Sequence, residues 1–138
     1  MNPTTKIPKS WPNFLRDSNN KVQLFHILAK SLQSMNVPGV DIYSTLETNV
    51  ISSSSLADIS FLAPCNHEEA DSRMILHVAD AARKGLKTCM VRTSDSDVLV
   101  LAIAYAKKVG VESLWASIGV GRHHQLVNAT AISDFFGR

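Results

Sequence analysis

The stretch that decides the fold is Lys87–Leu99, KTCMVRTSDSDVL. Its first seven residues include Thr, Met and Val, which predict a strand ending at Thr93. The preceding segment, 66–84, has apolar residues at helical spacing and is followed by a glycine, so a helix precedes this strand. A second apolar helix is expected over 97–108 and another strand over 113–118. Strand, helix and strand in this order predict a parallel α/β unit.

The remainder of the chain gives shorter signals. Residues 1–19 open with three prolines and no apolar period, so we expect an irregular lead-in there and a domain over 20–138. Asn20 precedes apolar residues at helical spacing, which predict a helix that ends before Val37. Further short elements are expected as strands over 40–43, 49–52 and 125–128, and as a helix over 129–136.

Composition limits the classes of protein. The chain has 138 residues, 45% of them hydrophobic and 19% charged, which is an ordinary globular balance. Fourteen Lys and Arg against 12 Asp and Glu are too even for a general polyanion binder, so any nucleic-acid site must be local. The longest apolar stretch, 98–106, is shorter than the ~20 residues of a membrane helix. We therefore expect an intracellular protein without a membrane segment. Cys65 and Cys89 form neither a disulfide framework nor a zinc quartet.

An acidic run, His67-Glu68-Glu69-Ala70-Asp71, opens the first of these helices. On a helical wheel, Asp71 falls in the middle of the apolar stripe, where a charge is costly unless it is paired or binds a metal. Glu68 lies one turn earlier on nearly the same face. Glu69 lies about 160° away from Asp71 and could join it only from an irregular first turn. Helix capping is the alternative explanation, with Glu69 reaching back to Asn66.

A second acidic pair, Asp95 and Asp97, directly follows the strand. Side chains at i and i+2 of a strand end lean to the same side, so both carboxylates could bind one hard cation. The carboxyl ends of parallel strands are also where α/β folds place their sites. Here too capping is the alternative: Ser94 or Asp95 would cap the next helix, which leaves one acid unexplained. Together the two acidic runs suit two-metal phosphodiester hydrolysis.

These residues resemble a known family. Glu69-Ala70-Asp71 followed by Thr93–Leu99 is similar to the internal region of flap endonucleases and related PIN-like nucleases. Three segments resemble uncharacterised, often transposon-associated animal proteins that carry this domain; they are Trp11–Leu15, Cys65–Arg73, and Leu114-Trp115 with Gly119–Arg122. The resemblance implies a three-layer sandwich with a central, mainly parallel sheet. The apolar strand with its Asp that begins the family pattern and the Gly-x-Asp loop that closes it do not occur, so the sandwich is expected to be incomplete.

The resemblance also implies ligands. Glu69, Asp71, Asp95 and Asp97 would hold Mg²⁺ or Mn²⁺, with Asp95 and Asp97 as the catalytic pair, and the helical wheel keeps Glu68 as the alternative to Glu69.

The implied activity is a metal-dependent nuclease acting on DNA or RNA. Apart from the resemblance, Arg73 and Arg92 could form a basic rim for the nucleic acid because arginine neutralises phosphates, and solvated surface is the alternative for both. The missing acids favour an alternative, a non-catalytic module that binds nucleic acid or protein. A third interpretation is a regulatory α/β domain with a single Mg²⁺ at the strand end. His123 and His124, beside Arg122, are interpreted as part of a polar loop.

Overall fold

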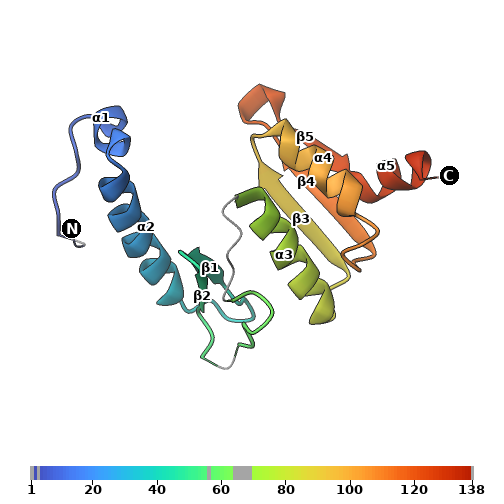
Figure 1. The fold of residues 1–138 in the computed structure, drawn as a ribbon, viewed down its shortest axis with the longest axis horizontal. Helices are drawn as coiled ribbons and strands as arrows, with labels where there is room; N and C mark the ends of the chain where they lie inside the picture. The colour runs from blue at the N-terminus through green and yellow to red at the C-terminus, as the bar shows by residue number, and fades with distance from the viewer. Residues whose placement is uncertain (1, 3, 56, 64–69, 138) are drawn as a thin grey trace. The chain divides into compact units, whose positions relative to one another are not determined.

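The protein is represented by a computed structural model that describes residues 2, 4–55, 57–63 and 70–137. The chain divides into two compact units, Met1–Asn66 and His67–Arg138. The described residues form a mixed α/β protein with five α-helices and two small sheets (Figure 1). Each unit has one of the two sheets. This division differs from the single domain over 20–138 that the sequence predicts.

The N-terminal unit contains two helices and a hairpin. Helix α1 covers Trp11–Arg16 and α2 covers Ser18–Gln33, so the expectation of an irregular chain over 1–19 is wrong for these residues. The cap of α2 is Asp17, three residues before the expected Asn20. Its carboxylate accepts hydrogen bonds from the backbone amides of Asn19 and Asn20, which starts the helix earlier than its apolar stripe.

The hairpin joins β1 (Tyr43–Leu46) to β2 (Asn49–Ser52) in antiparallel register. The prediction of a strand over 49–52 is confirmed, whereas the first strand begins three residues later than expected. The turn has two residues, so Leu46 pairs with Asn49. This register places Tyr43–Leu46, rather than 40–43, opposite β2.

The C-terminal unit follows the predicted order of elements closely. Helix α3 is described from Ala70 because 66–69 lie outside the described residues, and α4 ends three residues before the expected Lys108. Its elements are α3 (Ala70–Arg83), β3 (Thr88–Thr93), α4 (Ser96–Tyr105), β4 (Ser113–Ile118), the short 3₁₀ helix η1 (Gly121–His123), β5 (Gln125–Asn128) and α5 (Ala129–Phe136).

The sheet of this unit has the order β3-β4-β5. Strands β3 and β4 are parallel, as predicted, whereas β4 and β5 are antiparallel. Only six residues, 119–124, connect β4 to β5, and a parallel crossover needs a dozen or more. The sheet is therefore mixed rather than mainly parallel.

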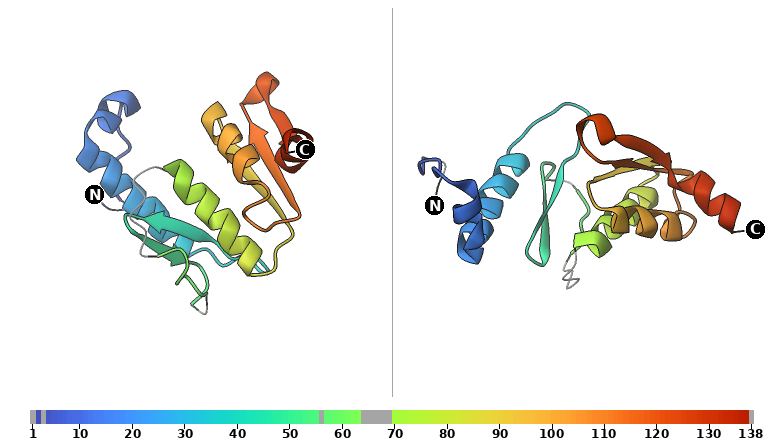
Figure 2. Two further views of the ribbon diagram at one scale, coloured as in Figure 1. Left: turned by 45° about the vertical axis from the view of Figure 1, so that its right-hand side comes forward. Right: turned by 90° about the horizontal axis from the view of Figure 1, so that it is seen from above.

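One face of this sheet is covered by helices. Figure 2 shows α3 and α4 on the same side of the three strands. Val91 of β3 and Leu114 of β4 point into a core with Val78 of α3 and Val98 of α4. On the opposite face, 63% of Met90 and 57% of Leu126 are exposed. The described part of this unit thus forms two layers, and the three-layer sandwich is not confirmed.

Among the helices that the structure describes, none has the length and apolar character that crossing a bilayer requires.

Candidate functional site

The two acids of the strand end occupy the loop between β3 and α4. The backbone amide of Asp95 donates to Thr93 Oγ1 at 3.0 Å, and the Asp95 carboxylate accepts from the amide of Asp97 at 2.9 Å. Asp95 is therefore the N-cap of α4, and Asp97 lies in its first turn. Both side chains are exposed. The capping alternative is confirmed for Asp95, and the helix dipole also favours Asp97 in the first turn.

Asp71 lies in the first turn of α3 and is half-buried. Helix α3 begins at the end of the sheet where β3 ends (Figure 1). Met74, Ile75 and Val78 pack against the core on this helix, which confirms the apolar stripe on which Asp71 falls.

The described residues do not complete a multidentate metal site. Within residues 2, 4–55, 57–63 and 70–137, no three His, Cys, Asp or Glu side chains are grouped closely enough to hold a metal ion. Asp71, Asp95 and Asp97 therefore do not form such a group. Glu68, Glu69 and Asn66, for which capping was the alternative expectation, lie outside the described residues.

The donor chemistry of Asp95 and Asp97 fits one hard cation. Mg²⁺ is commonly bound through one or two carboxylates and keeps several water ligands. The cap occupies Oδ1 of Asp95, and a carboxylate has a second oxygen that can bind a cation. The described pair therefore suits a single, mostly hydrated ion better than two ions.

A basic turn lies beside this acidic loop. Thr93 pairs with Ile118 in the parallel register, and the Gly119 amide donates to the Thr93 carbonyl at 3.3 Å. The turn that follows, 119–124, contains Arg122 and His123, both exposed. The sequence indicated a polar loop here but not its position beside Asp95, which only the strand register fixes.

His124 closes this turn through a side-chain hydrogen bond. Its Nε2 lies 2.6 Å from the Oγ of Ser117 in β4. Ser117 is buried, with 6% of its surface exposed, and pairs in register with the exposed Arg92 of β3. The sequence gives no signal for this contact, because Ser117 and His124 meet only when β5 turns back along β4.

A further acid, Asp80, lies at a position that the sequence pattern did not single out. Asp80 of α3 is buried, and its carboxylate lies 2.7 Å from Lys84 Nζ and 3.6 Å from Arg83 Nη1. The spacing of these bases at i+3 and i+4 was the available signal. Burial lowers the pKa of nearby His77; Asp80 opposes this shift, while Lys84 and Arg73 add to it. Arg73, expected in a nucleic-acid rim, is half-buried rather than exposed.

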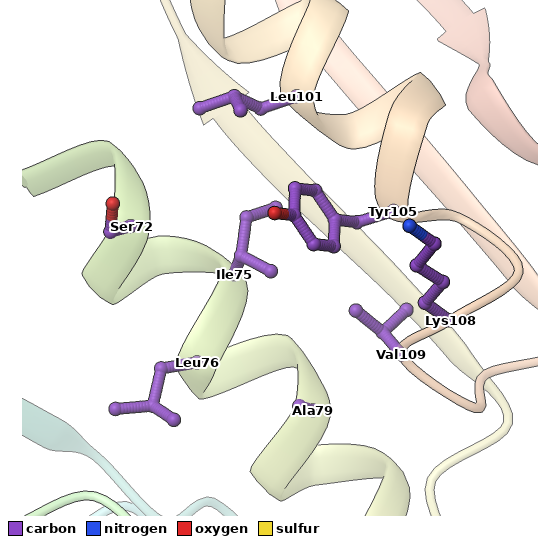
Figure 3. Close-up of a pocket in the computed structure, with 8 residues that line it drawn as sticks. All are labelled: Ser72, Ile75, Leu76, Ala79, Leu101, Tyr105, Lys108 and Val109. Atoms are coloured by element: carbon purple, nitrogen blue, oxygen red, sulfur yellow. The ribbon is translucent and has the colours of Figure 1, made fainter.

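A hollow of about 370 Å³ lies between α3 and α4. Figure 3 shows the Tyr105 ring and the Lys108 ammonium beside it, with Ile75 and Leu101 at its walls. The Lys108 ammonium lies 5.4 Å from the centroid of the Tyr105 ring. The hollow is mainly apolar. Its first lining residue on α4, Leu101, lies one helical turn after Asp97, so the hollow is separate from the acidic loop.

Comparisons with known protein families, with curated proteins and with solved structures find no match for this chain.

Proposed function

We propose that the protein is a nuclease domain of the PIN-like type, which hydrolyses phosphodiester bonds in DNA or RNA with Mg²⁺ or Mn²⁺. The observation that carries this proposal is the exposed pair Asp95 and Asp97 at the carboxyl end of the parallel strand β3. Such strand ends are the usual place for sites in α/β folds. The order of α3, β3, α4 and β4 supports the same scaffold.

The proposed roles follow from the chemistry of the side chains. Asp95 and Asp97 would hold the ion together with water ligands, and either Glu68 or Glu69, which lie outside the described residues, would be a further ligand. When bound, a divalent ion supplies positive charge to a phosphodiester and acidifies water.

A non-catalytic module on the same scaffold is the second candidate. Its support is that Asp71, Asp95 and Asp97 do not form a three-ligand group within the described residues. In this alternative the two acids of the loop serve only to start α4. The two candidates differ in whether the loop binds a metal ion at all.

Mn²⁺ binding and cleavage test the proposal together. We expect the wild-type chain to bind Mn²⁺ in calorimetric titration but to cleave labelled single-stranded or branched oligonucleotides weakly at most, because it supplies few of the ligands that two ions need. A chelator should abolish that cleavage. The double variant Asp95→Asn/Asp97→Asn should lose both properties and keep its circular dichroism spectrum, because little volume changes. Glu112→Gln is the matched control, since Glu112 is an exposed acid that directly precedes β4, at the opposite end of the strands.

Unchanged Mn²⁺ binding in the double variant would remove Asp95 and Asp97 from the site. Nucleic-acid binding without any metal binding or cleavage would favour the non-catalytic module instead.

A further inference from the structure

The carboxyl end of the sheet combines acidic and basic groups from different elements. The pairing of Thr93 with Ile118 and the hydrogen bond from Gly119 to Thr93 bring the loop of Asp95 beside the turn 119–124. Figure 1 shows this turn and the start of α4 at the same end of the sheet. A ligand bound to the acidic loop would therefore meet the basic turn as well.

The basic groups here differ from most others of this unit. Arg92 and Arg122 are exposed, and among the described residues no ion pair engages either of them. By contrast, Lys84, Lys87 and Lys107 each pair with a carboxylate. The sequences of β3, β4 and β5 contain no Asp or Glu. Arg92 is therefore the one charged residue of these three strands, and none of their other side chains neutralises it.

The turn is also held in one conformation. Gly119 has φ of +84°, and a Cβ there would lie 2.5 Å from the carbonyl oxygen of His123. The amides of His123 and His124 donate to Val120 and Gly121. The contact between Ser117 Oγ and His124 Nε2 fastens the end of the turn to β4. A fixed turn loses little conformational freedom when it binds a ligand.

We propose that Arg92 and the turn residues Arg122, His123 and His124 form a phosphate-binding rim for the backbone of a single nucleic-acid strand. The guanidinium group suits this ligand because its planar donors bind phosphate oxygens in pairs. Two neighbouring carboxylates, Asp95 and Asp97, would repel a polyanion, so the strand needs a cationic contact at this end of the sheet. The proposal rests on the proposed function, because the rim would hold the strand whose phosphodiester reaches Asp95 and Asp97.

The rim makes a prediction that does not depend on metal. Each phosphate contact on a single strand contributes about 0.7 to the slope of log affinity against log salt concentration. The affinity for 5′-labelled single-stranded DNA and RNA of one sequence would be measured by fluorescence anisotropy in EDTA across a salt series. For Arg92→Gln/Arg122→Gln we expect the slope to fall by about 1.4 and the affinity at low salt to fall at least tenfold.

Lys87→Gln is the matched control. Lys87 directly precedes β3, at the opposite end of that strand, and its side chain is 75% exposed, so the substitution removes one charge away from the rim. Its affinity should stay within twofold of wild type. Circular dichroism and size-exclusion chromatography would verify that both variants keep the fold and the oligomeric state of the wild type.

The outcomes separate this proposal from the nuclease proposal. If the Arg92→Gln/Arg122→Gln protein binds as tightly as wild type, or if the wild-type chain binds neither oligonucleotide, the rim is overturned. If that variant loses affinity while Asp95→Asn/Asp97→Asn keeps its Mn²⁺ binding, the rim stands and the metal site fails. A similar loss of affinity for DNA and for RNA supports recognition of the phosphate backbone that they share, whereas a loss of affinity for only one of them contradicts it.

Discussion

The Asp97 amide donates to Oδ1 of Asp95 at 2.9 Å, so the first residue of the proposed metal pair is also the cap of α4. The two roles require different properties of the side chain. The cap needs an acceptor oxygen, whereas the metal needs negative charge. Substitutions at this one position can therefore distinguish a structural role from a metal-binding role.

We expect Asp95→Ala to destabilise the C-terminal unit by about 1 kcal/mol, and Asp95→Asn to cost only a few tenths, because Asn is as good an N-cap as Asp. Both should lose Mn²⁺ binding. The measurement is urea unfolding followed by the fluorescence of Trp115 in a Trp11→Phe background, which leaves one Trp in the chain. Equal destabilisation by Asn and Ala would show that the charge, rather than the cap, stabilises this loop.

The ion pair of the buried Asp80 in α3 predicts a larger effect. Lys84→Met removes the 2.7 Å partner of a carboxylate that is 5% exposed, and leaving a buried acceptor unsatisfied costs about 1–3 kcal/mol. Oδ1 of Asp80 already has no hydrogen-bond partner among the described residues. Asp80→Leu/Lys84→Met should recover part of the loss, because apolar residues can replace a buried pair. A double variant less stable than Lys84→Met would contradict this account.

His77 predicts a dependence of stability on pH. Burial lowers its folded pKa below the ordinary value of 6.5, so the unfolded chain binds the proton more readily just below that pH. The neutral imidazole therefore contributes full stability above pH 6.5, and this contribution is lost as the pH falls through the folded pKa. Melting temperatures at pH 7.5 and 5.5 would measure the loss. His77→Gln should lose less than wild type over this range, and an identical loss would exclude His77 as the cause.

Gly119 and Gly121 allow a comparison within one turn. Both have positive φ, but only at Gly119 would a Cβ collide with backbone, the carbonyl of His123. Gly121→Ala should cost about 1 kcal/mol for the left-handed conformation alone. Gly119→Ala should cost clearly more and weaken nucleic-acid binding, because the turn must move. Chemical denaturation of the two variants tests this, and equal costs would mean that the turn adapts freely.

The local elements of the C-terminal unit could be predicted from the sequence because each has its own periodic pattern. The strands at Ser113–Ile118 and Gln125–Asn128 were predicted to the residue. The helices of the N-terminal unit were harder to predict, because α1 has only six residues and the cap of α2, Asp17, precedes the apolar stripe of that helix. Short elements depend on contacts that no local pattern encodes.

For the candidate site, the sequence predicted the position of two acids but not the residues that surround them. The positions of Asp95 and Asp97 at the end of β3 followed from the strand pattern. The neighbouring turn with Arg122 did not, because its position depends on the register of β4 against β3. Asp80 carried no prediction, and the structure buries it beneath the exposed Lys84, which pairs with it. Helical spacing alone does not show that a polar face is covered.

The position of β3 in the sheet has a consequence for self-association. It is the outer strand of the order β3-β4-β5, and outer strands present backbone groups to which a second copy can add edge to edge. If two copies paired antiparallel through this free edge with Arg92 opposite Arg92, the like charges would lie side by side, which disfavours such pairing. A charged residue on the outer strand therefore disfavours edge-to-edge association in that register, independently of the proposed role of Arg92 in binding.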